Sequence, residues 1–282
     1  MKKTFSYLSI LLLSIIFIVG CGSNPKKNLE TAFNKMHKLN SFAMDFKANI
    51  NTDDLSLPIK VTGLVNTENK VSHLEVSLSI SGEKSKTDLY LDSSIENQIT
   101  TYYQEQYDVE ELTWKKSTFD ITENNTYIDI SKFTEILDNA TSVETVKSED
   151  KNSIKYQITV SAKELNKLIA EETDELKDIV GTFNMNTENN LFIDVYVEKK
   201  SGYITKIYTD LSDLIVLEDD ESPKFIININ FSKFNDVGEI EIPVEIIKNA
   251  VENESDEIFD TEEDFNLQDD ITPKEDIISD IE

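Results

Sequence analysis

The sequence has no arginine, one cysteine, two histidines and seven glycines among 282 residues, and each scarcity argues against a kind of site. Without arginine, no guanidinium is present to grip phosphate or carboxylate through two parallel hydrogen bonds. The single cysteine, Cys21, cannot form a disulfide within the chain. Seven glycines leave little material for the glycine-rich loops that cradle phosphates. Phosphate-cradling loops and internal disulfides are therefore not expected.

Residues that could perform catalysis form no recognisable pattern. The sequence lacks Gly-x-Ser-x-Gly, His-Glu-x-x-His, P-loop and Gly-x-Gly-x-x-Gly motifs. His37 and His73 lie far apart in the chain, and we expect both to be exposed. Adjacent carboxylates such as Asp219 and Asp220 arise freely among 55 acids, so a glycosidase-like pair or a weak calcium site remains an unspecific alternative. We expect no catalysis, no cofactor and no metal site.

The charge of the chain limits its partners. The 27 basic residues are all lysines, and they face 55 aspartates and glutamates. Removal of Lys2 and Lys3 with a leader leaves 25 − 55 = −30. Nucleic acids and anionic lipid head groups repel so acidic a chain. No nucleic acid is expected as a partner. Contact with a membrane requires a means of attachment other than electrostatic attraction.

The N-terminus offers such a means of attachment. Lys2 and Lys3 precede an apolar run that ends in "IVGCGSN", which is the build of a secretory signal over residues 1–20. Ile18 to Cys21 resembles the bacterial lipobox. The resemblance implies cleavage before Cys21 and a diacylglycerol on its sulfur, with residues 21–27 as a tether. An uncleaved anchor with an idle thiol is the alternative.

The location of the protein follows from this anchor. We expect the outer face of a bacterial cytoplasmic membrane, with the acyl chains holding the domain there. The abundance of lysine, isoleucine and asparagine favours a low-GC Gram-positive source.

The last segment, residues 249–282, holds fourteen acids and one lysine, a net charge of 1 − 14 = −13. Such a composition buries too little apolar surface to offset chain entropy, so we expect a disordered acidic tail. Asp260, Glu262 and Asp264 alternate as in the start of an EF-hand loop. Phe265 stands where that loop needs glycine, which favours a solvated tail over calcium capture.

Residues 28–248 are expected to form one mainly β domain. Apolar residues at helical spacing predict an opening helix over 24–41, and a spacing of two follows from Phe42 onward. Further helices are expected over 129–140 and from Ser161, where "SAKE" has the form of a capping box. The glycine turn at Gly202 predicts a hairpin. Strands are expected at 42–51, 58–66, 74–80, 85–91, 98–105, 112–118, 153–160 and 224–234, and in the hairpin around Gly202.

Three stretches resemble the LolA/LppX/LprG-like exported lipoproteins, including an uncharacterised Gram-positive branch. They are "MHKLNSF" before the first strand, the hairpin "VEKKSGYITKI", and the terminal "FSKFNDVGEIEIPVEI". The resemblance covers most of residues 28–248. It implies an α+β, mainly β fold, in which a large antiparallel sheet of about 10–11 strands curls into a half-barrel with helices on its concave face.

The resemblance also implies a hydrophobic cavity between sheet and helices that takes a lipid or other apolar ligand. Its expected lining is Phe46, Ile50, Val76, Leu78, Phe133, Leu137, Val195, Ile227 and Ile229. Alternating apolar faces occur in any antiparallel sheet, so these residues could equally be packed core. In that case, the protein is a non-catalytic surface protein that contacts other envelope proteins.

Overall fold

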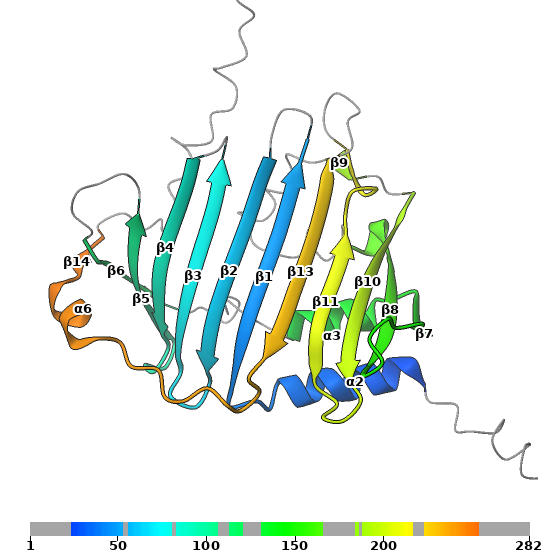
Figure 1. Cartoon of the computed structure of the whole chain (residues 1–282), viewed down its shortest axis with the longest axis horizontal. Helices are drawn as coiled ribbons and strands as arrows, with labels where there is room; N and C mark the ends of the chain where they lie inside the picture. The colour runs from blue at the N-terminus through cyan, green and yellow to red at the C-terminus, as the bar shows by residue number, and fades with distance from the viewer. Residues whose placement is uncertain are drawn as a thin grey trace, which may run out of the picture.

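The computed structural model describes residues 24–52, 56–80, 83–106, 113–120, 131–165, 184–185, 188–216 and 223–253. Cys21 and most of the expected acidic tail lie outside these residues, and so do the carboxylates at 219, 220, 260, 262 and 264. The described residues form one large sheet with helices at its ends (Figure 1).

The sheet is a mainly antiparallel half-barrel, which confirms the expected fold class. Its twelve strands follow the order β14-β6-β5-β4-β3-β2-β1-β13-β11-β10-β8-β7. The strands are β1 Ser41–Asn51, β2 Ser56–Asn66, β3 Val71–Ile80, β4 Glu83–Asp92, β5 Gln98–Gln106, β6 Lys115–Asp120, β7 Ser142–Val146, β8 Ser153–Ser161, β10 Asn190–Glu198, β11 Ile204–Asp210, β13 Lys224–Ser232 and β14 Val251–Glu252. A separate pair joins β9 (Asn184–Met185) to β12 (Ile215–Val216).

Register places the apolar residues of neighbouring strands on one face. Phe46 of β1 lies opposite Ile229 of β13 on one side and Val61 of β2 on the other. Val61 in turn lies opposite Val76 of β3. Because side chains of a strand alternate between faces, these pairs define an inner, apolar face. The intervening residues, such as Lys47, define an outer face.

Helices cover one end of the inner face. Helix α2 (Pro25–Met36) starts at Asn24, whose side chain accepts a hydrogen bond from the backbone N–H of Lys27, and carries proline in its first turn. It contacts β7, β11 and α3 (Ser131–Asp138). The predicted helix over 129–140 is therefore present, although residues 129 and 130 lie outside the described residues.

The main core lies under these helices. Its members are buried residues of α2, α3, the strands β1, β2, β8, β10, β11 and β13, and adjoining segments: Leu29, Ala32, Phe33, Met36, Leu39, Phe42, Val65, Leu137, Tyr156, Ile158, Val160, Ala162, Leu191, Ile193, Val195, Val197, Ile204, Ile207, Leu214 and Phe231. The stripe predicted for the first helix is thus buried as expected. The capping box is formed in part, because the backbone N–H of Glu164 donates to Ser161 Oγ over 3.2 Å.

A belt of residues 233–243 follows β13 and runs along the lower ends of the strands toward α6 (Val244–Asn249) (Figure 1). Side chains of the β2–β3 turn hold it. Asn66 Nδ2 donates to the carbonyl of Gly238 over 3.0 Å, and Asn69 Nδ2 donates to the carbonyl of Ile240 over 2.8 Å. The belt thereby ties the lower end of the sheet.

The folded body extends beyond residue 248, which corrects the expected start of the tail at 249. After α6, strand β14 pairs in parallel with β6. The N–H of Val251 donates to the carbonyl of Trp114, and the N–H of Asn253 donates to the carbonyl of Lys116. The backbone of this short segment pairs with the edge strand of the sheet. Its acidic composition does not predict this pairing, because the hydrogen bonds come from the backbone and not from the side chains.

Candidate functional site

The inner side chains of β13, β1, β2 and β3 form a contiguous surface that we call the apolar face. It consists of Phe46, Ile50, Ile59, Val61, Val76, Leu78, Ile227 and Ile229. Each residue lies opposite, or two positions from, another member on the next strand. The surface results from four strands that keep the period of two in the same register.

Burial divides this face from the core. Phe42 and Val65, near α2, are 3% and 8% exposed. Four residues further along the same strands, Phe46 and Val61 are only half-buried, and so is Val76 beside Val61. The side chains remain large and apolar along the strands, but fewer neighbouring atoms bury them. Large apolar groups that are left partly accessible on an inward face are typical of ligand sites.

The residues expected to line a cavity fall into four groups. Phe46, Ile50, Val76, Leu78 and Ile227 lie on the apolar face and are half-buried. Ile229 lies on this face and packs against the core.

Leu137 and Val195 are each 0% exposed within the core, so they contribute packing in this structure and no accessible surface. Phe133 belongs to α3, but its side chain lies outside what the structure describes.

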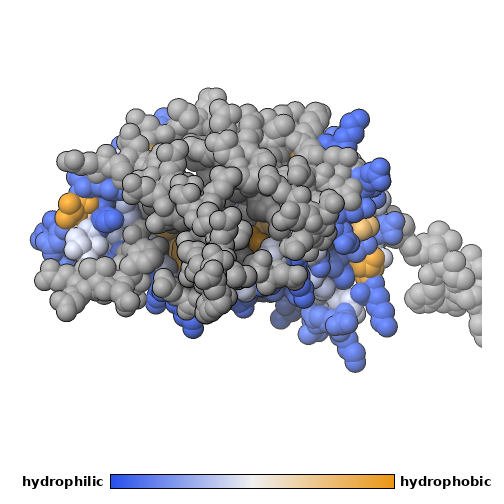
Figure 2. All heavy atoms as spheres, turned by 90° about the horizontal axis from the view of Figure 1, so that it is seen from above, coloured by the Kyte–Doolittle hydropathy of each residue, from blue (hydrophilic) through white to orange (hydrophobic). Residues whose placement is uncertain are grey.

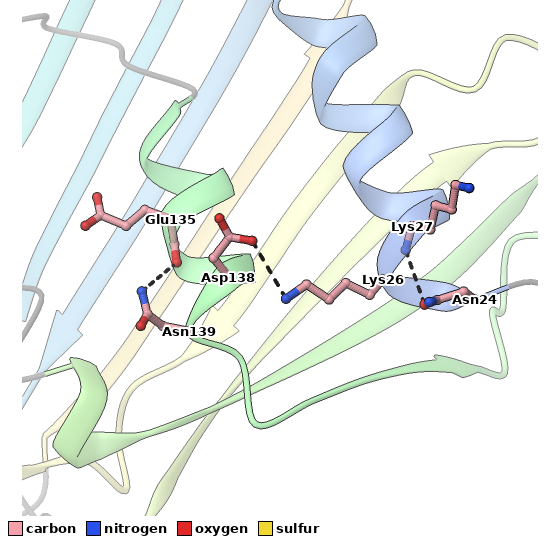
Figure 3. A network of polar contacts seen from close by, with 6 residues as sticks. All are labelled: Asn24, Lys26, Lys27, Glu135, Asp138 and Asn139. Carbon is pink, nitrogen blue, oxygen red and sulfur yellow. Dashed lines mark hydrogen bonds and ion pairs between the residues drawn. The ribbon is translucent and has the colours of Figure 1, made fainter.

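Helix α3 is held to α2 by one ion pair and by core packing. Lys26 Nζ lies 3.7 Å from Asp138 Oδ1 across the two helices (Figure 3). At the C-terminal end of α3, Asn139 Nδ2 donates to the carbonyl of Glu135 over 3.0 Å. Leu137 points into the core between these polar contacts. This arrangement fixes α3 over one end of the inner face.

The outer face carries charge and hydrogen bonds. Lys155 Nζ lies 2.6 Å from Asp194, and Lys86 Nζ lies 2.7 Å from Glu75. The hydrogen bond that the Lys86 ammonium donates to Glu75 raises the pKa of Lys86. Paired charges on the outside and apolar groups on the inside give the sheet two faces of opposite chemistry.

The two histidines differ from each other in surroundings. His37 is exposed, as expected. His73 is half-buried, because its ring stacks on Tyr90 at 4.3 Å and its Nε2 lies 2.6 Å from Asp88 Oδ1. No group of three or more possible metal-ligating side chains occurs in the described part of the chain.

Two buried hydroxyls on the inner face were missed by the sequence reasoning. Thr101 and Ser117 face each other across β5 and β6 and are 0% and 5% exposed. Neither hydroxyl oxygen has a hydrogen-bond partner among the described residues. The run "TTYY" holds the signal, since a period of two puts Thr101 and Tyr103 on one face, but both faces there look alike in sequence.

Seen from above, the described residues around the rim of the molecule are mainly hydrophilic, and hydrophobic residues show only in small areas (Figure 2). Within the described ranges, no helix has both the length and the apolar character needed to cross a bilayer.

No family model matches this chain, and no curated protein matches it. Solved structures do. The lipoprotein LppX of Mycobacterium tuberculosis is 10% identical, with 77% of this chain and 98% of that chain covered at a TM-score of 0.43. LprF of Mycobacterium bovis is 11% identical, with 78% and 96% covered at a TM-score of 0.47.

Proposed function

We propose that this chain is a lipid-anchored extracytoplasmic protein that binds a lipid or another hydrophobic ligand on the apolar face. The observation that carries the proposal is the partial exposure of Phe46, Val61 and Val76 on an inward face whose other end, under the helices, is fully packed. Covering such groups with acyl chains contributes about 25 cal/mol per Å² of apolar area removed from water. A non-catalytic binding role needs no other chemistry.

The contrast with the core favours a ligand over simple packing. Val195 on β10 and Val76 on β3 both point inward from strands of the same sheet. Val195 has no exposed surface, whereas Val76 is half-buried. An inward valine side chain is thus fully buried in one half of the sheet and only partly buried in the other. A hydrophobic ligand supplies the missing cover.

The anchor in this proposal is Cys21. Its position after the apolar run, the Ile-Val-Gly sequence before it and the absence of other cysteines support acylation. The acyl chains hold an acidic domain that anionic head groups repel. The outer face of the cytoplasmic membrane of a Gram-positive bacterium is the proposed location.

A tryptophan scan of β3 tests the ligand site. The chain 22–282 keeps every described residue and can be produced without the leader. Val76→Trp fills the apolar face, while Ser77→Trp places the same ring on the outer face as a matched control. We expect saturable uptake of a fluorescent fatty acid that Val76→Trp weakens at least tenfold and Ser77→Trp leaves unchanged.

Native mass spectrometry of the same chain checks for copurified lipid. Equal uptake by the Val76→Trp and Ser77→Trp variants would show that the ligand binds away from the apolar face. Absence of both copurified lipid and saturable uptake contradicts the proposal, and contact with other envelope proteins then becomes the leading function.

A further inference from the structure

Thr101 and Ser117 place two buried hydroxyls beside the apolar face. They lie directly opposite each other, Thr101 on β5 and Ser117 on β6. Their side chains point to the inner face, because Tyr103, two residues from Thr101, lies opposite Leu89, which lies opposite Leu74. A Cβ added at Gly63 of β2 would meet the side chain of Leu74, so all these groups share the inner side.

The neighbourhood of the two hydroxyls is polar and held in place. The parallel register of β14 with β6 brings Asn253 next to Ser117. Asn253 Nδ2 donates to the hydroxyl oxygen of Tyr103 over 2.7 Å. Lys115 lies opposite Tyr103, with its Nζ 5.8 Å from the centre of the ring. We call Thr101, Tyr103, Ser117 and Asn253 the hydroxyl cluster.

Two adjacent buried hydroxyls without partners among the described residues need an explanation. A hydroxyl removed from water without a replacement hydrogen bond costs free energy, and folded proteins keep few such groups. The outward pair on the same strands shows the contrast, since Thr100 Oγ1 and Thr118 Oγ1 lie 3.4 Å apart. The inward pair is thus oriented toward a partner that the described chain does not supply.

We infer that the hydroxyl cluster binds the polar end of the ligand, so that the ligand is an amphiphile with a hydroxyl or ester group. This inference rests on the proposed function. Four strand spacings separate β5 from β1, which is about 19 Å at the usual distance between strands. The register places Thr101 level with Ser72 of β3, four residues or about 13 Å along the strands from the level of Val76. An acyl chain that lies on Phe46 and Val76 and runs diagonally across β4 can therefore place its ester beside Thr101 and Ser117.

The chemistry of the cluster selects the group that it binds. Serine and threonine hydroxyls donate and accept, so they match ester carbonyls and alcohols. Glycerol esters occur both in a neutral diacylglycerol and in an anionic phosphatidylglycerol, and the shared ester is the recognised group. Lys115 is exposed at the edge of the cluster, where a phosphate adds an attraction that a diacylglycerol lacks.

Ligand titrations of the chain 22–282 test the inference. The probes are a fluorescent diacylglycerol, a fluorescent phosphatidylglycerol and a fluorescent alkane without a polar end. Thr101→Val and Ser117→Ala each remove one inward hydroxyl, and Thr100→Val removes an outward hydroxyl as a matched control. We expect Thr101→Val and Ser117→Ala to weaken diacylglycerol binding about tenfold, which is about 1.4 kcal/mol. Alkane binding and the control variant should not change.

The two lipid arms identify the recognised group. Equal losses for diacylglycerol and phosphatidylglycerol assign the glycerol ester, and a loss for diacylglycerol alone assigns its free alcohol. Either result supports the hydroxyl cluster.

Three results overturn the inference or its basis. Unchanged diacylglycerol affinity in both inward variants shows that the hydroxyls hold only water. Equal losses for diacylglycerol and alkane, with a lowered Tm of the unliganded variant, show a structural role. Failure of the unaltered chain to bind any of the three probes overturns the proposed function itself, whereas binding that neither Thr101→Val nor Ser117→Ala changes overturns the hydroxyl cluster alone.

Discussion

At the scale of single residues, the proposed location of the protein depends on Cys21. Cys21→Ala removes the sulfur that we propose to receive the diacylglycerol, so we expect the variant to lose fatty-acid labelling and to keep its leader. Ser23→Ala, two residues away, keeps the sulfur and should be labelled normally. Growth with radiolabelled palmitate followed by gel analysis measures both. Labelling of the Cys21→Ala variant would show that the lipid is attached elsewhere.

The carboxyl of Asp150 gives a second test at this scale. Its Oδ2 accepts a hydrogen bond from Ser153 Oγ over 2.5 Å, and its Oδ1 accepts from the backbone N–H of Asn152 over 2.9 Å. These bonds, the one from Ser153 first, hold the pKa of Asp150 below its ordinary value. A lowered pKa contributes stability that is present above the ordinary value and is lost as the pH falls through the folded value.

Carbon-13 NMR titration of the side-chain carboxyl measures this pKa. We expect Ser153→Ala to move it back toward the ordinary value, because the larger of the two hydrogen-bond contributions disappears. Ser148 donates to the backbone carbonyl of Asp150, not to its carboxylate, so Ser148→Ala is the control. An unchanged pKa in Ser153→Ala would assign the shift to the backbone N–H instead.

The sequence predicts the face of the sheet on which an apolar residue lies better than it does for a polar residue. Phe46, Val76 and Ile227 alternate with polar neighbours, so a period of two assigns them to one face. Thr101 follows Thr100 and precedes two tyrosines, and there the two faces carry the same residue types. Which threonine is buried depends on what covers each face, and that cover comes from elements far away in the chain.

At the scale of elements, core packing and an ion pair both hold the short helix α3, and their contributions can be compared. Leu137 is fully buried, whereas the side chains of Lys26 and Asp138 are 37% and 68% exposed. Leu137→Ala should lower the free energy of unfolding by about 3 kcal/mol, because it leaves a cavity in the core. Lys26→Met should change it by less than about 0.5 kcal/mol, since exposed ion pairs contribute little. Urea unfolding measures both, and similar losses would make the ion pair the main tie.

Most strands matched the expected ranges, and the misses have a physical cause. The strands predicted at 58–66, 85–91 and 98–105 lie within β2, β4 and β5. β7 (Ser142–Val146) is only five residues long, and β14 is only two. Such short strands form because a neighbouring edge offers backbone partners, not because their own side chains alternate.

At the scale of the whole molecule, the C-terminal segment can be divided by two truncations. A chain that ends at Asn253 keeps β14, and a chain that ends at Ala250 loses it. The shorter chain lacks the hydrogen bonds to Trp114, Lys116 and Tyr103, so we expect it to be about 1–2 kcal/mol less stable, with a Tm a few degrees lower. The longer chain should melt like the full chain. A lower Tm for the longer chain would show that residues after 253 also pack on the body.

The order of strands in the sheet could not be predicted from the sequence. Hydrophobic periodicity identifies strands and their apolar faces, but it is silent on which strand lies beside which. The pairing of β1 with β13 and the parallel pairing of β14 with β6 join distant parts of the chain. These pairings place the hydroxyl cluster beside the apolar face, so the candidate site emerges only with the topology.

The pairing of β1 with β13 also sets the order in which the chain can fold. Strands β1 to β6 follow one another as neighbours, and their contacts are local. Ala43 and Ser232 pair although they are 232 − 43 = 189 positions apart. Contacts between such distant residues form late and slow the folding of a chain. One edge of β1 therefore stays open until the last fifth of the chain arrives, and refolding at high concentration should lose chains to intermolecular pairing that dilution prevents.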